Sequence, residues 1–149
     1  MIVSRLLYGL SSAWLNAAQL RRLNGFQARC LRRILGIPAA FVSRVSNQEV
    51  LQRSGQLQLS HQLLRQQLLA LGRIARAPDN DVCRQLVFRP KSLDFVSDMY
   101  VRRIGRPRQE WGKELFKKAK ALVMKLQPEL NVQDAINDAA IWRSLVYRL

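Results

Sequence analysis

The chain has 149 residues, and its 25 lysines and arginines outnumber its 10 acidic residues, which gives a formal net charge of +15. This length suits about one domain, and 48% hydrophobic residues argue against an intrinsically disordered chain. Such an excess of positive charge indicates a polyanionic partner, either a nucleic acid or an anionic membrane surface.

The positive charge changes character along the chain. Up to Pro78 there are eleven basic residues, all arginine, and the single acid Glu49. After Pro78 there are fourteen basic residues, now mixed with lysine, and nine acids. Because the guanidinium fork matches a phosphate in a bidentate manner, the first half is the better candidate for close phosphate contact.

The sequence predicts no disulfide, no metal site and no cofactor. Cys30 and Cys83 lie far apart, and with His61, the one histidine, they do not reach the four ligands of a structural zinc site. The apolar N-terminus lacks a basic leader region and is interrupted by Arg5, so we expect neither a signal peptide nor a membrane span. These features favour a nuclear or cytoplasmic protein that is not secreted.

Two helices are expected in the first forty residues. The segment 2–10 reads as a short apolar helix that ends at Gly9. Asn16, with Gln19 three residues later, forms a capping-box pattern before a long helix that Gly36 and Pro38 close.

The segment 19–37 of this second helix separates into two faces at about 100° per residue. The apolar face holds Leu20, Leu23, Phe26, Cys30, Leu31 and Ile34. An arc of about 120° on the other side holds Arg21, Arg22, Arg29, Arg32 and Arg33. No acid lies in the segment, and like charges on one face repel each other unless a polyanion lies across them. The pattern therefore predicts phosphate contact, with a solvated surface face as the alternative.

A helix pair is expected over 46–77. Ser46 and Glu49 form a second capping box, and the helix they start ends near Gly55. Ser60 is expected to cap the next helix, which runs to Ala77. Its buried stripe is Leu63, Leu64, Leu68, Leu71, Ile74 and Ala75, and its opposite face carries a second basic stripe of Arg65, Arg73 and Arg76.

A basic loop is expected at 89–107, after a short helical turn that Asp79 and Asp81 precede. It leads into Gly105-Arg106-Pro107-Arg108, which is similar to the core of an AT-hook, whose arginines enter the minor groove. The loop thereby adds four candidate nucleic-acid contacts: Arg102, Arg103, Arg106 and Arg108.

Two more helices are expected, over 108–126 and after Asp138. Trp111 and Trp142 lie on their apolar stripes and read as core anchors. No convincing alternating strand pattern occurs, so the fold class is predicted as all-α, an irregular bundle of about five to seven helices. The expected domains are an arginine-rich helical part at 1–88, the linker at 89–107 and a C-terminal helical hairpin at 108–149, packed on the first part.

No catalytic constellation can be assembled, so the chain is not expected to be an enzyme: it offers no nucleophile with a base and no phosphate-binding glycine loop. The order of short helix, turn and longer helix over 46–77 suggests a helix-turn-helix DNA reader as an alternative. His61 falls where that motif needs an apolar residue, so the pattern fits an ordinary pair of packed helices better.

Several phrases, in order, resemble the region that follows the polymerase core in non-LTR (LINE-type) retrotransposon reverse transcriptases. They are Leu6-Leu7-Tyr8-Gly9 with Trp14, Phe26-Gln27, Leu31-Arg32-Arg33-Ile34-Leu35-Gly36-Ile37, Arg44-Val45-Ser46-Asn47, Glu49-Val50-Leu51, Gln67-Leu68-Leu69, Gly72, Ala75-Arg76-Ala77-Pro78, and Gly105-Arg106-Pro107-Arg108 with Trp111.

The resemblance implies a non-catalytic thumb or post-thumb region that grips a template–primer backbone, whether RNA–DNA hybrid, RNA or DNA. The family's Tyr/Phe-x-Asp-Asp palm motif, zinc knuckle and endonuclease are absent from this sequence. We therefore expect a C-terminal fragment, with Met1 an internal methionine of a longer frame or the start of a decayed remnant. The remaining alternatives are a free-standing helix-turn-helix protein, or a remnant that docks on the missing fingers and palm of a polymerase.

Overall fold

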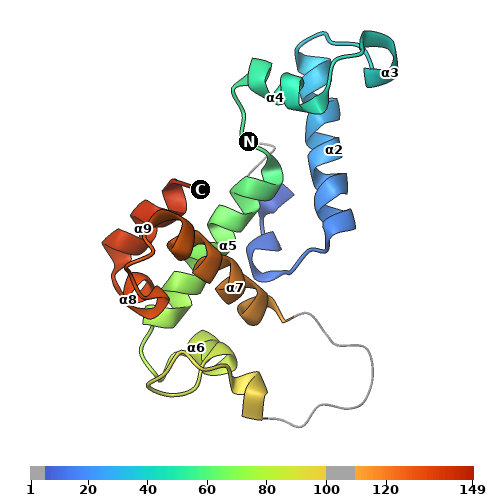
Figure 1. Cartoon of the computed structure of the whole chain (residues 1–149). Coiled ribbons are helices and arrows are strands. Elements are labelled where there is room, and N and C mark those ends of the chain that lie inside the picture. The colour runs from blue at the N-terminus through green and yellow to red at the C-terminus, as the bar shows by residue number, and fades with distance from the viewer. Residues whose placement is uncertain (1–5, 100–109) are drawn as a thin grey trace. The chain divides into compact units, whose positions relative to one another are not determined.

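The computed structural model describes residues 6–99 and 110–149. The fold is all-α, as the sequence predicts. In the described ranges, no extended pairing goes beyond one isolated antiparallel bridge, between Phe88 and Phe95. The helices, shown in Figure 1, are η1 (Leu10–Ser12), α2 (Ala17–Ile34), α3 (Ala40–Ser43), α4 (Asn47–Ser54), α5 (Leu59–Arg76), α6 (Val82–Val87), η2 (Val96–Met99), α7 (Trp111–Leu126), α8 (Val132–Asn137) and α9 (Ala139–Tyr147).

The chain divides into two compact units. Unit 1 comprises residues 1–10 and 15–64, and unit 2 comprises residues 11–14 and 65–149. The division falls inside α5, whereas the expected division was at 88 and 108. Residues 65–88 group with the C-terminal helices because the second half of α5 packs against α9: Trp142 of α9 donates a hydrogen bond from Nε1 to the carbonyl of Leu68, 2.9 Å away.

Unit 1 is built on α2, beside which α4 packs (Figure 1). The Asn16 capping box forms as predicted, with Asn16 Oδ1 accepting from the Gln19 amide and Gln19 Oε1 accepting from the Asn16 amide. Leu7, Leu59 and Leu63 form a small buried cluster. Of the expected helix at 2–10, residues 2–5 lie outside the described residues, while Leu6 and Leu7 are helical.

The first turn of α5 is capped differently from the prediction. Ser60 lies within the helix, and α2 supplies the acceptors: Gln27 Oε1 for the Leu59 amide at 2.9 Å and Asn24 Oδ1 for the Ser60 amide at 3.0 Å. The prediction that Ser60 is the cap is wrong, because side-chain amides of the neighbouring helix α2 satisfy the free N–H groups. Ser46 caps α4 as predicted, but Glu49 bonds Arg53 and not the Ser46 amide.

Unit 2 holds the larger core. Leu68, Leu71, Leu115, Val123, Ile136, Trp142 and Val146 are among its buried side chains. Trp142 is fully buried and Trp111 is partly buried with its Nε1 bonded to the Ser11 carbonyl, so both serve as core anchors as predicted. The short helix α8, capped by Asn131, was not foreseen. Asp138 caps α9 as predicted, accepting from the amides of Ala140 and Ile141.

Candidate nucleic-acid interface

Four arginines of α2 form an exposed surface, which we call the α2 arginine face: Arg21, Arg22, Arg29 and Arg33. None of the four side chains takes part in a hydrogen bond or an ion pair with a described residue. The described part of unit 1 contains seven arginines and one acid, and that acid, Glu49, is already paired with Arg53 at 2.5 Å. The face therefore carries positive charge without a protein counter-charge, which is the condition for attracting phosphates.

Arg32 was predicted on the same face, but its side chain is buried, with 6% of the residue exposed. Its Nη2 donates to the Val45 carbonyl at 2.6 Å and to Asn47 Oδ1 at 3.1 Å, and its Nη1 donates to the Pro38 carbonyl at 3.1 Å. The segment 38–47 wraps over the C-terminal end of α2 and satisfies the guanidinium. Arg32 consequently holds a loop in place, and we leave it out of the α2 arginine face.

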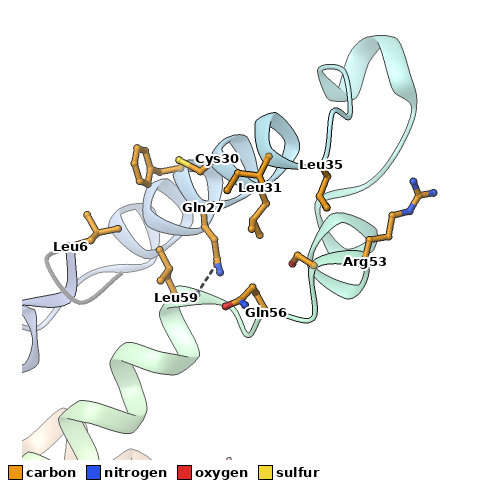
Figure 2. A pocket seen from close by; sticks show the side chains of 11 residues that line it. Leu6, Gln27, Cys30, Leu31, Leu35, Arg53, Gln56 and Leu59 are labelled. Atoms are coloured by element: carbon orange, nitrogen blue, oxygen red, sulfur yellow. Dashed lines mark hydrogen bonds between the residues drawn. The ribbon is translucent and has the colours of Figure 1, made fainter. Parts of the chain in front are cut away.

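The most deeply buried side of α2 does not coincide with the apolar face that its sequence predicts. Gln27, Ala28 and Arg32 are the buried residues of the helix, whereas Phe26 is 39% exposed and Ile34 is 76% exposed. Both line an apolar groove of about 430 Å³ within unit 1. Figure 2 shows this groove, with Cys30, Leu31 and Leu35 on one side and Arg53, Gln56 and Leu59 on the other.

The second predicted stripe, Arg65, Arg73 and Arg76, is divided by its contacts. Arg65 lies over the ring of Tyr147, with its guanidinium carbon 5.3 Å from the ring centroid, and donates to the Tyr147 carbonyl. Arg76 donates from Nη1 to the Ile136 carbonyl. Arg73 is exposed, and within the described ranges it makes no hydrogen bond or ion pair. The stripe thus belongs to unit 2 and is partly used for packing.

The four loop candidates, Arg102, Arg103, Arg106 and Arg108, lie outside the described residues. The preceding segment leads from the Phe88–Phe95 bridge into η2, where Lys113 of α7 pairs with Asp98 at 2.5 Å and with Glu110 at 3.2 Å. Both bonds raise the pKa of Lys113, and the bond to Asp98 has the larger effect. The charge of Lys113 is therefore compensated, unlike the charges of the α2 arginine face.

Sequence reasoning missed two basic residues. Arg84 is buried, and its guanidinium bonds the carbonyls of Ala75 and Ser92 and the carboxylate of Asp79. Arg143 of α9 lies exposed beside Arg73 and Arg76 in a shared pocket. Nothing in the sequence indicates that Arg84 is buried, because an arginine on a short helix normally faces solvent. Arg143 could have been found only with the packing of α9 on α5.

Other kinds of site receive little support in the described part of the chain. No three side chains of histidine, cysteine, aspartate or glutamate gather there as a metal site would require. Cys30 and Cys83 are both free thiols. None of the described helices has both the length and the apolar content needed to cross a membrane.

Comparisons with protein-family models, with curated proteins and with solved structures find no match to this chain. The class that the fold and the candidate site define is therefore that of an all-α, strongly basic protein with an unpaired arginine surface.

Proposed function

We propose that this protein binds the phosphate backbone of nucleic acids through the α2 arginine face, as a helical, thumb-like piece of a non-LTR retrotransposon reverse transcriptase. One observation carries the proposal: four exposed arginines on one helix have no partner among the described residues and no unpaired acid within the described part of unit 1. Held apart by a rigid helix, guanidinium groups of this kind can each engage one phosphate of a duplex or hybrid strand.

The resemblance to the reverse-transcriptase family supplies the kind of nucleic acid. A thumb region grips a template–primer duplex, so the expected ligand is an RNA–DNA hybrid, with RNA or DNA duplexes as related ligands. The proposal contains no catalytic step, because the sequence lacks the Tyr/Phe-x-Asp-Asp motif of the family. It places the protein in the nucleus or the cytoplasm, where such ligands occur.

The test is binding of the purified chain to a labelled RNA–DNA primer–template over a salt series. With four phosphates engaged, the plot of log affinity against log salt has a slope of about −4. The triple variant Arg22→Gln/Arg29→Gln/Arg33→Gln flattens this slope to about −1 and weakens binding roughly 10- to 100-fold at 0.1 M salt. Arg32 is left intact, so that the fold of segment 38–47 is preserved.

The matched control is Lys118→Gln/Lys120→Gln/Lys125→Gln on α7, which removes the same charge from exposed side chains of unit 2. It leaves the slope within about one unit of the wild type. Equal losses in the two triple variants would reduce the effect to net charge and contradict a specific face. A preference of at least ~10³ for one selected DNA sequence would favour the helix-turn-helix alternative.

A second candidate function is docking of unit 1 on a polymerase body through the apolar groove of Figure 2. The observation that favours it is the exposure of Phe26 and Ile34, side chains that a stably covered helix would bury. The salt series separates the two candidates, since a flat slope in the wild type leaves the α2 arginine face without a nucleic-acid role. Docking then becomes the better explanation of the surface.

A further inference from the structure

A second basic site lies within unit 2, in a pocket of about 430 Å³ that residues of α9 and of the C-terminal half of α5 line. Both helices are labelled in Figure 1. Its lining residues are Leu69, Arg73, Arg76, Ala139, Trp142, Arg143 and Tyr147. Three of the seven are arginines, and we call the cavity the arginine pocket. Its volume lies within the range of about 300–1,000 Å³ that is typical of small-molecule sites.

The wall of the arginine pocket is rigidly built. Trp142 is fully buried and bonds the Leu68 carbonyl through Nε1. Gly72 permits this packing, because a Cβ at that position would overlap the indole of Trp142 and crowd the guanidinium of Arg76. Arg76 is itself held by its bond to the Ile136 carbonyl. The part of the pocket formed by Trp142 and Arg76 is therefore fixed before any ligand arrives, which lowers the entropic cost of binding on that side.

The positive charge in the arginine pocket is only partly compensated. Burial lowers the pKa of Arg76, and the neighbouring charges of Arg143 and Arg73 lower it further, while Asp138 opposes the change. Asp138 is the one acid among these neighbours, and its Oδ1 accepts from two amides at the start of α9. The side chains of Arg73 and Arg143 form no hydrogen bond or ion pair with any described residue. Three guanidinium groups against one carboxylate leave a local charge of about +2, which a bound anion would neutralise.

We propose that the arginine pocket binds the terminal phosphate of a phosphomonoester. Near neutral pH a monoester phosphate carries a charge of about −1.5 to −2 and three acceptor oxygens, which match three guanidinium groups and the local charge. A phosphodiester inside a strand carries one charge and two free oxygens, so it fits less well. The volume leaves space for an organic group, and the ring of Tyr147 offers that group an apolar contact.

This site is separate from the α2 arginine face, since all its residues belong to unit 2. The phosphomonoester has two possible sources: a free nucleotide, or the phosphorylated end of a nucleic-acid strand. Both present the same terminal phosphate, so the chemistry of the pocket is the same in the two cases. The experiment below distinguishes them.

The first measurement is calorimetric titration of the full chain with inorganic phosphate, with a nucleoside monophosphate and with the matching nucleoside. The proposal expects saturable binding of the two phosphates and at least ~10-fold weaker binding of the nucleoside. Arg73→Gln/Arg143→Gln weakens the phosphate complexes at least ~10-fold, and because both side chains are exposed and unpaired, the far-UV circular dichroism is unchanged. Arg76 is kept, since it supports α8.

The charge-matched control is Lys118→Gln/Lys125→Gln, which retains wild-type phosphate affinity. Equal affinity for nucleoside and monophosphate, or equal weakening by the pocket variant and the control, would overturn the proposal. The α2 triple variant keeps its phosphate affinity if the two sites are independent. Failure of the pocket and failure of the α2 arginine face therefore give different patterns.

Binding of two single-stranded oligonucleotides identifies the source of the phosphate. They have the same sequence, and one carries a 5′-phosphate and the other a 5′-hydroxyl. If the 5′-phosphate strengthens binding to the wild type and not to Arg73→Gln/Arg143→Gln, the pocket takes strand ends. If the two oligonucleotides bind equally while the nucleoside monophosphate binds through Arg73 and Arg143, the pocket takes free nucleotides. No phosphate-dependent difference in any of the ligands overturns the proposal.

Discussion

The two units differ in how much of their positive charge is paired with acids. In the described part of unit 1, Glu49 is the one acid, and it pairs with Arg53, so the α2 arginine face has no internal counter-charge. In unit 2, Lys113 pairs with Asp98 and Lys117 pairs with Glu114, while Arg73 and Arg143 of the arginine pocket have no side-chain partner among the described residues. A charged side chain that is paired within the protein helps to order the surface. An unpaired one is available to a charged partner. The comparison identifies unit 1 as the better candidate for a polyanionic ligand.

Each unit also buries one arginine for a structural purpose. Arg32 in unit 1 donates hydrogen bonds to carbonyls of segment 38–47, and Arg84 in unit 2 donates to the carbonyls of Ala75 and Ser92. Arginine suits this role because its five N–H donors lie in a fixed plane and can serve several acceptors at once. Whether an arginine is buried or left exposed thus depends on whether nearby segments supply acceptors for its guanidinium. Two arginines that are neighbours in the sequence can therefore differ in role.

The largest effect expected from a single substitution follows from that contrast within α2. Arg32→Met removes a buried guanidinium that serves several acceptors, and we expect the free energy of unfolding of unit 1 to fall by about 3 kcal/mol. The adjacent change Arg33→Met removes an exposed, unpartnered side chain and alters stability by no more than about 0.5 kcal/mol. Urea unfolding followed by circular dichroism, with hydrogen exchange of amides 39–47, measures both.

Similar losses in the two methionine variants would show that the two neighbours do not differ in role. For nucleic-acid affinity we expect the reverse order, with the larger loss in Arg33→Met. Arg33→Met weakens binding to the RNA–DNA primer–template, while Arg32→Met does so only as far as α2 itself unfolds.

A smaller effect, opposite in sign between the units, is expected at two helix glycines. Gly72→Ala in α5 forces a methyl group into the indole of Trp142, and we expect unit 2 to lose about 2 kcal/mol. Gly25→Ala in α2 meets nothing within 4 Å and is expected to stabilise unit 1 by about 0.5–1 kcal/mol, because alanine favours the helix.

Both glycine variants can be measured on the intact chain. All three tryptophans, Trp14, Trp111 and Trp142, belong to unit 2, so their fluorescence follows its unfolding. Hydrogen exchange of α2 amides follows unit 1. A stabilising Gly72→Ala would contradict the packing of α9 on α5, and with it the rigid wall of the arginine pocket.

The extent to which the sequence determined these features varies by element. Local patterns were sufficient for α2 and for its capping box, for the Ser46 cap of α4 and for the Asp138 cap of α9, because each cap bonds within three residues of itself. The buried stripe of α5 was also predictable from its period, with Leu63, Leu68 and Leu71 buried.

Features that depend on distant parts of the chain could not be read in this way. The cap of α5 comes from Asn24 and Gln27, more than thirty residues earlier. Arg32 lies within the basic arc of the helical wheel, and only the path of segment 38–47 reveals its burial. Arg143 joins Arg73 through tertiary packing. Composition identified the basic character of the candidate site, but long-range contacts decide which arginines are free.

The smallest expected effect concerns the acid side of the pH–stability profile of unit 2. Asp79 Oδ1 accepts from the Lys91 amide at 3.1 Å and from Arg84 Nε at 3.0 Å, and these bonds lower the pKa of Asp79, the Lys91 bond most strongly. Lys91 has a φ of 57°, which a non-glycine residue seldom adopts without such support. A carboxylate with a lowered folded-state pKa stabilises the fold above its unfolded value of about 4, and this contribution is lost as the pH falls through the folded-state pKa.

Asp79→Asn therefore gives a shallower fall in stability than the wild type below about pH 4, with lower stability near neutrality, since the amide cannot reproduce the ion pair with Arg84. The matched variant Glu129→Gln, at an exposed carboxylate with no bond to a described residue, follows the wild-type profile. Urea unfolding by tryptophan fluorescence between pH 3 and pH 7 makes the comparison. An acid limb that is unchanged in Asp79→Asn would mean that the charge pairing assigned to unit 2 contributes nothing at this loop, and the contrast with unit 1 would then depend on the lysines of α7 alone.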